Sequence, residues 1–179
     1  MNRICVMTLV VCLAAAGLLA QGSQPAPPRR SPEDIRAQMA RLADSDAAVR
    51  ALAACYLAEM RLDAAPAIET LTRLLADATL TDPVLCGRDI GPATVRGPHR
   101  STPGLEAARA LAAAGEDGAE ALLAAATSPN TATRRHAIRG LTYLRDRRSL
   151  PVFLEAMRDA DPAVRADAAR GLGRIPRRW

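Results

Sequence analysis

Apolar residues recur at helical spacing along most of the chain after residue 30. Val, Ala and Leu at intervals of four make a narrow apolar stripe along one side of a helix. Each stripe follows an Asp or Asn, whose side chain can accept a hydrogen bond from a free amide of the first helical turn. The pattern predicts helices that bury the following residues: Val49, Ala53, Leu57, Ala137, Leu141, Val164, Ala168 and Leu172.

Three of these segments also carry an arginine four residues after the Asp or Asn. An arginine at this spacing lies above the cap on the same face and can pair with its carboxylate. We therefore expect caps and anchors at the turns between repeats, namely Asp46 with Arg50, Asn130 with Arg134, and Asp161 with Arg165. A degenerate copy begins at Pro103 and has Gly104 at the arginine position.

A preceding helix accompanies each of these segments. The predicted starts are a capping box at Ser31-Pro32-Glu33-Asp34, then Ala65-Pro66, Asp117 and Ser149-Leu150-Pro151. The sequence thus predicts four helix pairs, at about 31–60, 64–114 (interrupted), 117–144 and 149–175. One helix cannot bury its stripe alone, so each pair has to stack on the next.

The composition supports a helical fold. Aromatic residues make up only 2% of the chain, and alanine supplies much of the apolar content. A core of small residues suits closely packed helices better than a β-sandwich, which needs β-branched and aromatic side chains. We therefore expect an all-α protein.

The repeated motif resembles a known family. From Asp159 to Gly173 the chain reads DADPAVRADAARGLG, which is similar to bacterial HEAT-like repeats of the phycobilisome-lyase type. The resemblance spans nearly all of 31–175, is strongest in the last repeat and is poor in the second. It implies a short right-handed α-solenoid of about four helix-pair repeats, used as a binding or scaffolding surface. It does not imply lyase activity.

The first 22 residues have the pattern of a secretory signal peptide. Arg3 supplies the positive start, residues 4–19 are apolar, and residues 20–22 are suited to cleavage. The apolar run is short for a membrane span, so no transmembrane span is expected in the mature chain. We expect export to the periplasm or the extracellular space, with an uncleaved N-terminal anchor as the alternative. Residues 23–30 form a Pro-rich linker.

An irregular insertion interrupts the second repeat at 79–102, where Gly and Pro rule out a continuous helix. A loop of this length is either functional or a floppy insertion. It contains Cys86, which together with Cys55 remains after cleavage of the signal. In an exported protein the two cysteines form a disulfide, or else stay as unpaired thiols.

All 24 basic residues are arginine, and they are placed unevenly. Residues 131–179, including a basic tail at 176–179, hold 12 Arg against 5 Asp or Glu. Arg109, Arg139 and Arg170 occupy equivalent places in successive repeats, and Arg135 adds to the row. Such an arginine ladder can grip carboxylate or phosphate groups of a partner, or remain a solvated row. If these arginines make no contacts within the fold, reversing the charges of Arg139 and Arg170 should not lower the stability of the protein.

No catalytic or metal-binding constellation stands out. His99 and His136 lack a Cys or His partner at metal-ligand spacing, so no metal or other cofactor is expected. His136 is expected to be an ordinary surface histidine. Cys86 and His99 are thirteen residues apart in an irregular loop, which is a weak basis for a nucleophile and its base. The sequence therefore favours a protein that is not an enzyme.

Three functions are compatible with these features. The first is an exported, monomeric scaffold or adaptor whose concave face binds another protein. The second is an anion-binding surface for a polyanionic envelope component, formed by the basic C-terminal repeats. The third is an accessory to a lyase or another enzyme, using the insertion. Nucleic acid is disfavoured because the signal peptide directs the chain out of the cytoplasm.

Overall fold

The computed structural model describes residues 31–81 and 101–176, and the elements in these ranges are helical. Four helix pairs follow one another along the chain and form an α-solenoid. The helices are α1 (Pro32–Arg41), α2 (Ala47–Met60), α3 (Ile68–Leu74), α4 (Pro103–Ala113), α5 (Glu116–Ala125), α6 (Thr131–Leu144), α7 (Leu150–Ala156) and α8 (Pro162–Leu172). Two short 3-10 helices, Arg61–Ala67 and Arg147–Ser149, precede α3 and α7.

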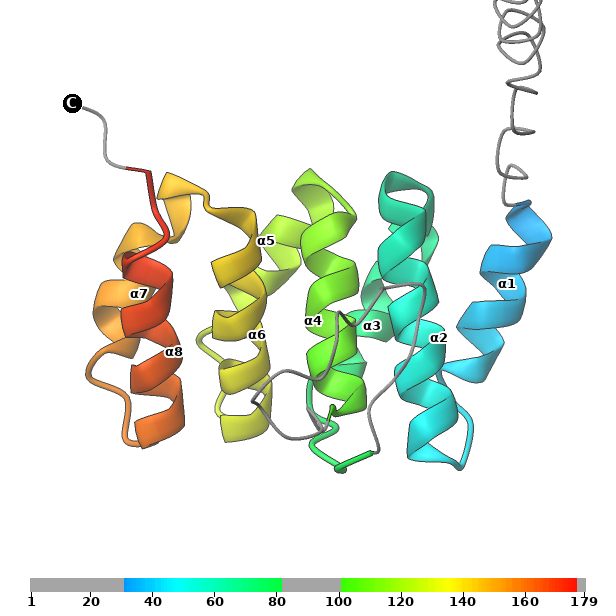
Figure 1. Cartoon of the computed structure of the whole chain (residues 1–179), viewed down its shortest axis with the longest axis horizontal. Helices are drawn as coiled ribbons and strands as arrows, with labels where there is room; N and C mark the ends of the chain where they lie inside the picture. The colour runs from blue at the N-terminus through cyan, green and yellow to red at the C-terminus, as the bar shows by residue number, and fades with distance from the viewer. Residues whose placement is uncertain (1–30, 82–100, 177–179) are drawn as a thin grey trace, which may run out of the picture.

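The second helix of each pair forms one row of the molecule. Figure 1 shows α2, α4, α6 and α8 side by side along the long axis, with α3, α5 and α7 behind them. Alanines and leucines from both rows fill one continuous core between them. We refer to α2, α4, α6 and α8 as the second-helix row.

The apolar stripes face this core. Six of the eight predicted stripe residues are buried, namely Ala53, Leu57, Ala137, Leu141, Val164 and Ala168. Val49 and Leu172 are half-buried, because they lie near the start and the end of their helices. The spacing of four therefore identified the buried side of α2, α6 and α8.

Side-chain caps begin most of these helices. Ser31 and Asp34 form a reciprocal capping box at α1, in which the Asp34 amide donates to Ser31 Oγ and the Ser31 amide to Asp34 Oδ2. The side chains of Asp46, Asn130 and Asp161 accept from amides of the first turns of α2, α6 and α8. Each cap satisfies an amide that has no acceptor within the helix.

Two predicted helix starts were wrong in position. The segment with Ala65-Pro66 is part of a 3-10 helix, and α3 begins only at Ile68. Helix α5 begins at Glu116 after Gly115, whose φ of 86° favours glycine, so Asp117 lies inside the first turn and is not its cap.

The two ends of the insertion meet at the base of α4. Thr81 and Ser101 form an isolated antiparallel bridge, with the Thr81 amide 2.9 Å from the Ser101 carbonyl oxygen. Cys86 and His99 lie outside the described residues, as do the predicted signal peptide at 1–22 and the predicted linker at 23–30. Cys55 is buried in α2 and is disulfide-bonded, while its pairing with Cys86 stays a prediction. Within 31–81 and 101–176, no helix has the length and apolar character needed to cross a membrane.

Candidate binding surface

Arg50 and Arg134 connect neighbouring repeats. The sequence had predicted that each anchor arginine pairs with its own cap, and this prediction was wrong. Arg50 places Nη1 on the carbonyl oxygens of Asp44 and Ser45, at 2.7 and 2.9 Å. Its Nε and Nη2 reach Asp77 in the next repeat, at 2.9 and 2.6 Å. The cap carboxylate of Asp46 is engaged by an amide of its own helix instead, which leaves the arginine free to bridge repeats.

Arg134 repeats this geometry. Its Nη1 donates to the carbonyl oxygens of Ser128 and Pro129, both at 3.0 Å, while Nε and Nη2 reach the two Asp159 oxygens at 2.8 and 3.1 Å. The hydrogen bond from Arg134 lowers the pKa of Asp159, which is therefore ionised at neutral pH. Arg165 makes the same two carbonyl bonds, to Asp159 and Ala160.

The arginine ladder lies on the second-helix row, and its members are held by acidic side chains from that row. Arg109 Nη1 lies 2.7 Å from Glu106 Oε1, and Glu106 also accepts from Ser101 Oγ at 2.5 Å. The Arg109 guanidinium sits 5.7 Å from the centre of the Tyr143 ring, and its Nε donates to the Tyr143 hydroxyl at 3.3 Å. This arginine thus links α4 to α6.

Asp167 holds the other two members of the ladder. Arg139 Nε lies 2.9 Å from Asp167 Oδ1 across the α6–α8 contact, but the N–H is not aligned for a hydrogen bond, so the contact is a pure ion pair. Arg170, one turn along α8, donates to the same oxygen. Asp167 is buried, and a buried carboxylate needs such partners. The expectation that the ladder would be free of the fold was wrong.

Three buried polar side chains occupy the same register position in successive repeats, and the predictions from the sequence did not include them. Glu106, His136 and Asp167 are spaced 30 and 31 residues apart, three positions before Arg109, Arg139 and Arg170. The matching positions in α2 hold Leu52 and Cys55, so the polar column is confined to α4, α6 and α8. The shared spacing was visible in the sequence, and it could have identified these side chains as a set.

His136 is buried, contrary to the expectation of a surface histidine. Its Nδ1 lies 2.8 Å from the Leu75 carbonyl oxygen, to which it must donate, and its Nε2 lies 3.1 Å from Thr102 Oγ1. A neutral imidazole satisfies both contacts, because Nε2 can then accept the hydroxyl proton. Burial lowers the pKa of His136 from its usual 6.5, and the charges of Arg135 and Arg139 act in the same direction.

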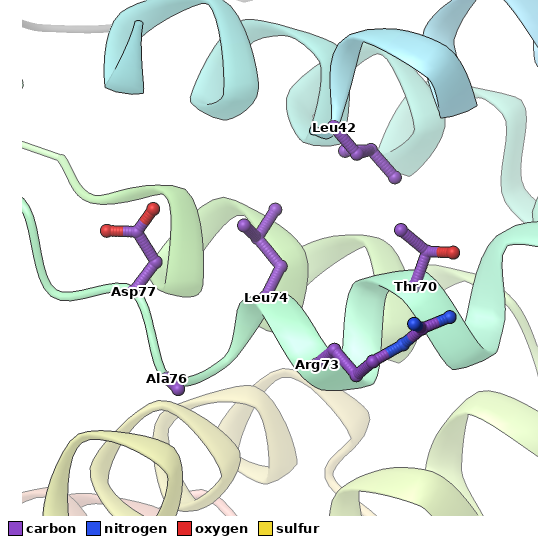
Figure 2. A pocket seen from close by; sticks show the side chains of 6 residues that line it. All are labelled: Leu42, Thr70, Arg73, Leu74, Ala76 and Asp77. Atoms are coloured by element: carbon purple, nitrogen blue, oxygen red, sulfur yellow. The ribbon is translucent and has the colours of Figure 1, made fainter. Parts of the chain in front are cut away.

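A shallow depression lies apart from the ladder, between the end of α1 and α3. Figure 2 shows its lining by Leu42, Thr70, Arg73, Leu74, Ala76 and Asp77, around a volume of about 390 Å³. The Asp77 carboxylate is engaged by Arg50, and Arg73 forms an exposed pair with Glu69 at 3.4 Å. In 31–81 and 101–176, no group of three or more His, Cys, Asp or Glu side chains is placed to hold a metal ion.

The ladder therefore forms a rigid, half-exposed surface. Between 29% and 45% of each ladder side chain remains exposed, although each guanidinium contacts a buried carboxylate. Fixed guanidinium groups lose little entropy when they bind carboxylates or aromatic rings. Tyr143 is exposed beside them, and Arg135 is exposed on α6. Together Arg109, Arg139, Arg170 and Tyr143 define what we call the ladder surface.

Comparison with known proteins identifies the repeat. The HEAT repeat family matches residues 119–177, which comprise the third and fourth helix pairs. No curated protein matches the sequence.

Solved structures with similar folds include two engineered proteins and a natural complex. One engineered protein has 22% identity over 79% of this chain and a TM-score of 0.44, and this chain spans 62% of its length. Another has 24% identity over 79% of this chain and 37% of its own, with a TM-score of 0.41. The complex of CpcE and CpcF of phycocyanin lyase from Nostoc sp. has 17% identity over 86% of this chain and 67% of its own, with a TM-score of 0.41. The described residues thus form four stacked helix pairs, and the part of the chain at 119–177 matches the HEAT repeat family.

Proposed function

We propose that this protein is an exported scaffold or adaptor that binds another protein through the ladder surface. The observation that carries the proposal is the arrangement of Arg109, Arg139 and Arg170. Their guanidinium groups are held by Glu106 and Asp167, yet the arginine side chains remain 29%, 32% and 45% exposed. Export rests on the apolar segment after Arg3, and the binding role rests on the HEAT-like fold.

The pairing within the ladder favours a protein over a polyanion. Glu106 offsets the charge of Arg109, and Asp167 is shared by Arg139 and Arg170, so the row carries less net charge than its arginines suggest. Arginine and tyrosine beside one another are the residue types that dominate protein–protein contacts. A partner segment with carboxylate and aromatic side chains would match this mixed surface.

A polyanionic envelope component is the second candidate. The excess of arginine in residues 131–179 favours it, because a cationic surface attracts anionic polymers over a distance. Such binding depends strongly on ionic strength, whereas a packed protein contact depends on it less. Titration with heparin over a range of salt concentrations distinguishes the two candidates.

The ladder surface is best tested by a variant that removes its charges as a set. Arg139→Gln, Asp167→Asn and Arg170→Gln together leave no buried charge without a partner. The matched control is Glu69→Gln with Arg73→Gln, an exposed pair on α3. Mature protein is immobilised, envelope extract is passed over it, and the captured proteins are identified by mass spectrometry.

We expect at least one protein that the wild type and the control capture, and that the ladder variant does not. Capture that is unchanged in the ladder variant contradicts the proposal. Heparin binding that is lost in the same variant, without a lost protein, assigns the surface to the polyanion instead.

A further inference from the structure

The last repeat ends in an apolar stripe that nothing covers in the described part of the chain. Leu150, Leu154 and Met157 follow one another at i, i+4 and i+7 along α7, and so lie on one side of this helix. Their exposed fractions are 37%, 51% and 40%. The other side of α7 packs into the core through Phe153 and Ala156.

The same register positions are covered in the earlier repeats. Met157 corresponds to Leu42, Leu75 and Ala126, which are exposed by only 3%, 0% and 8%. Leu150 corresponds to Ala119, which is also buried. The other counterparts of Leu150 and Leu154 are half-buried, namely Ile35, Ile68, Met39, Thr72 and Leu123. Gly118 of α5 packs against Leu111 and Ala114 of the preceding repeat. Leu42, at the end of α1, lies across a shallow depression from Thr70 and Leu74 of the following repeat, so we take the position of Met157 to face a following repeat as well. The stripe on α7 is therefore one half of a repeat interface.

Arg165 on α8 provides the polar part of the same interface. Arg50 and Arg134 each use Nη1 for two carbonyl oxygens, and Nε and Nη2 for an aspartate of the next repeat. Arg165 makes the two carbonyl bonds, to Asp159 and Ala160 at 2.8 and 2.9 Å. The Asp159 carboxylate acts on it only through space, and no carboxylate of the described residues forms a hydrogen bond or an ion pair with its guanidinium. Its guanidinium is thus held in position for an acceptor from a following repeat.

The acceptor has a defined local structure. Asp77 and Asp159, the aspartates that receive Arg50 and Arg134, also accept from the amide two residues later, at 3.0 and 2.9 Å. Each aspartate therefore lies in a local turn that follows the first helix of its pair. A partner that completes the interface needs an aspartate in such a turn, with an apolar helix beside it.

Charge and polarity argue against a second copy of this chain as the partner. Two copies meeting through their last repeats would bring together two segments with an excess of arginine. At the opposite end of the molecule, Asp34, Ala37 and Arg41 of α1 are exposed, and two of these three side chains are charged. Such a polar end is suited to terminating an array and is a poor cover for an apolar stripe.

We propose that the end face formed by Leu150, Leu154, Met157 and Arg165 docks an acidic helical hairpin of a partner protein. The apolar side of the hairpin covers the stripe, and an aspartate in its turn accepts both free edges of the Arg165 guanidinium. The geometry is the one that joins the repeats inside this chain. The site is separate from the ladder surface, and does not depend on it.

Site-specific crosslinking tests the proposal in the full-length chain, expressed in its native host. A photo-crosslinking residue replaces Leu154, and the matched control replaces Glu155, its exposed neighbour on another side of α7. We expect an adduct only from position 154, with a helical segment of another protein that contains an aspartate in a turn. Arg165→Gln should reduce the adduct at least tenfold, whereas Arg73→Gln on α3 should leave it unchanged.

Several results would overturn the proposal. These are no adduct at position 154, equal adducts at 154 and 155, or an adduct with lipid or with a second copy of this chain. The proposal is also wrong if the crosslinked partner segment contains no acidic residue. It is equally wrong if the reciprocal Asp→Arg change in the partner does not restore binding to Arg165→Asp. Leu154→Gln serves as a folding check, and it should abolish the partner contact without lowering Tm. A marked loss of Tm would show that the stripe is packed within the fold.

Discussion

At the scale of single residues, a histidine replaces a missing anchor. Gly104 stands where the other repeats have arginine, so the second repeat cannot hold the third in the usual way. His136 fills this space, since a Cβ on Gly104 would lie 2.3 Å from its Nδ1. The sequence showed that Gly104 replaces the arginine of the other repeats. It did not show that His136 takes over the contact, because the Leu75 carbonyl oxygen that His136 contacts is 61 residues from it in the sequence.

Acidification should weaken the protein through His136. Because burial lowers its pKa in the folded state, the unfolded chain takes up a proton first as the pH falls below about 6.5. The contribution of His136 is complete above that pH, and is lost as the pH falls towards the folded pKa. Urea midpoints at pH 7.5 and 5.5 should fall more for the wild type than for His136→Gln. Equal losses would show that the pKa of His136 is the same in the folded and unfolded states.

The contact between Arg134 and Asp159 should contribute more than an exposed ion pair. Both side chains are largely buried, and charge-assisted hydrogen bonds of this kind contribute about 1.5–3 kcal/mol. Asp159→Asn should lower the free energy of unfolding by a similar amount. The control is Glu155→Gln, which breaks the exposed pair with Arg158 and should cost less than about 0.5 kcal/mol. Chemical denaturation measures both, and equal effects would contradict the prediction.

At the scale of the helices, glycine sets how closely neighbours approach. A Cβ on Gly118 of α5 would lie 2.0 Å from the Leu111 carbonyl oxygen, which is backbone and cannot rotate away. Gly173, just after α8, has space around its Cβ position and a helical φ of −68°. Gly118→Ala should therefore destabilise the protein by about 1–3 kcal/mol. Gly173→Ala should be neutral or stabilising by about 0.4–1 kcal/mol. Comparable Tm losses in both variants would rule out this account.

The predicted elements were reliable where local chemistry determined them. Ser31 and Asp46 cap the helices that they precede, because a cap needs only amides of the same first turn. The starts predicted at Ala65-Pro66 and Asp117 were wrong, because a proline can also occupy a 3-10 helix and a glycine with positive φ can also begin a helix. Local signals leave these alternatives open, and packing against the neighbouring helices selects one.

At the scale of the whole molecule, periodicity predicted the stack but not its polar connections. The alignment on arginine gave four repeats and the core positions of α2, α6 and α8, because these repeats bury the same positions. It placed the ladder on one row but treated it as free, since nothing in one repeat shows that Asp167 of α8 reaches Arg139 of α6. Contacts between repeats depend on how the helices stack, which a motif within one repeat does not contain.

The exposed end of the array leads to a prediction about the whole molecule. Pro176 corresponds to Arg145 one repeat earlier, so a copy of residues 145–179 placed directly after Ile175 continues the register. Stability in such arrays is approximately the sum of the repeats and their interfaces. The added repeat should cover Leu154 and Met157, and should supply a second Asp159 to Arg165. The extended chain should therefore melt at a higher temperature, by about 2–4 °C for each kcal/mol gained.

The control for the extended chain carries Asp159→Ala only in the added copy. It should lose part of the gain, because Arg165 again lacks an acceptor while the apolar contact remains. Tm values from circular dichroism compare the original, extended and control chains. If the extended chain melts no higher than the original, then the end of α7 and α8 is not an open repeat interface, and its apolar stripe has another cause.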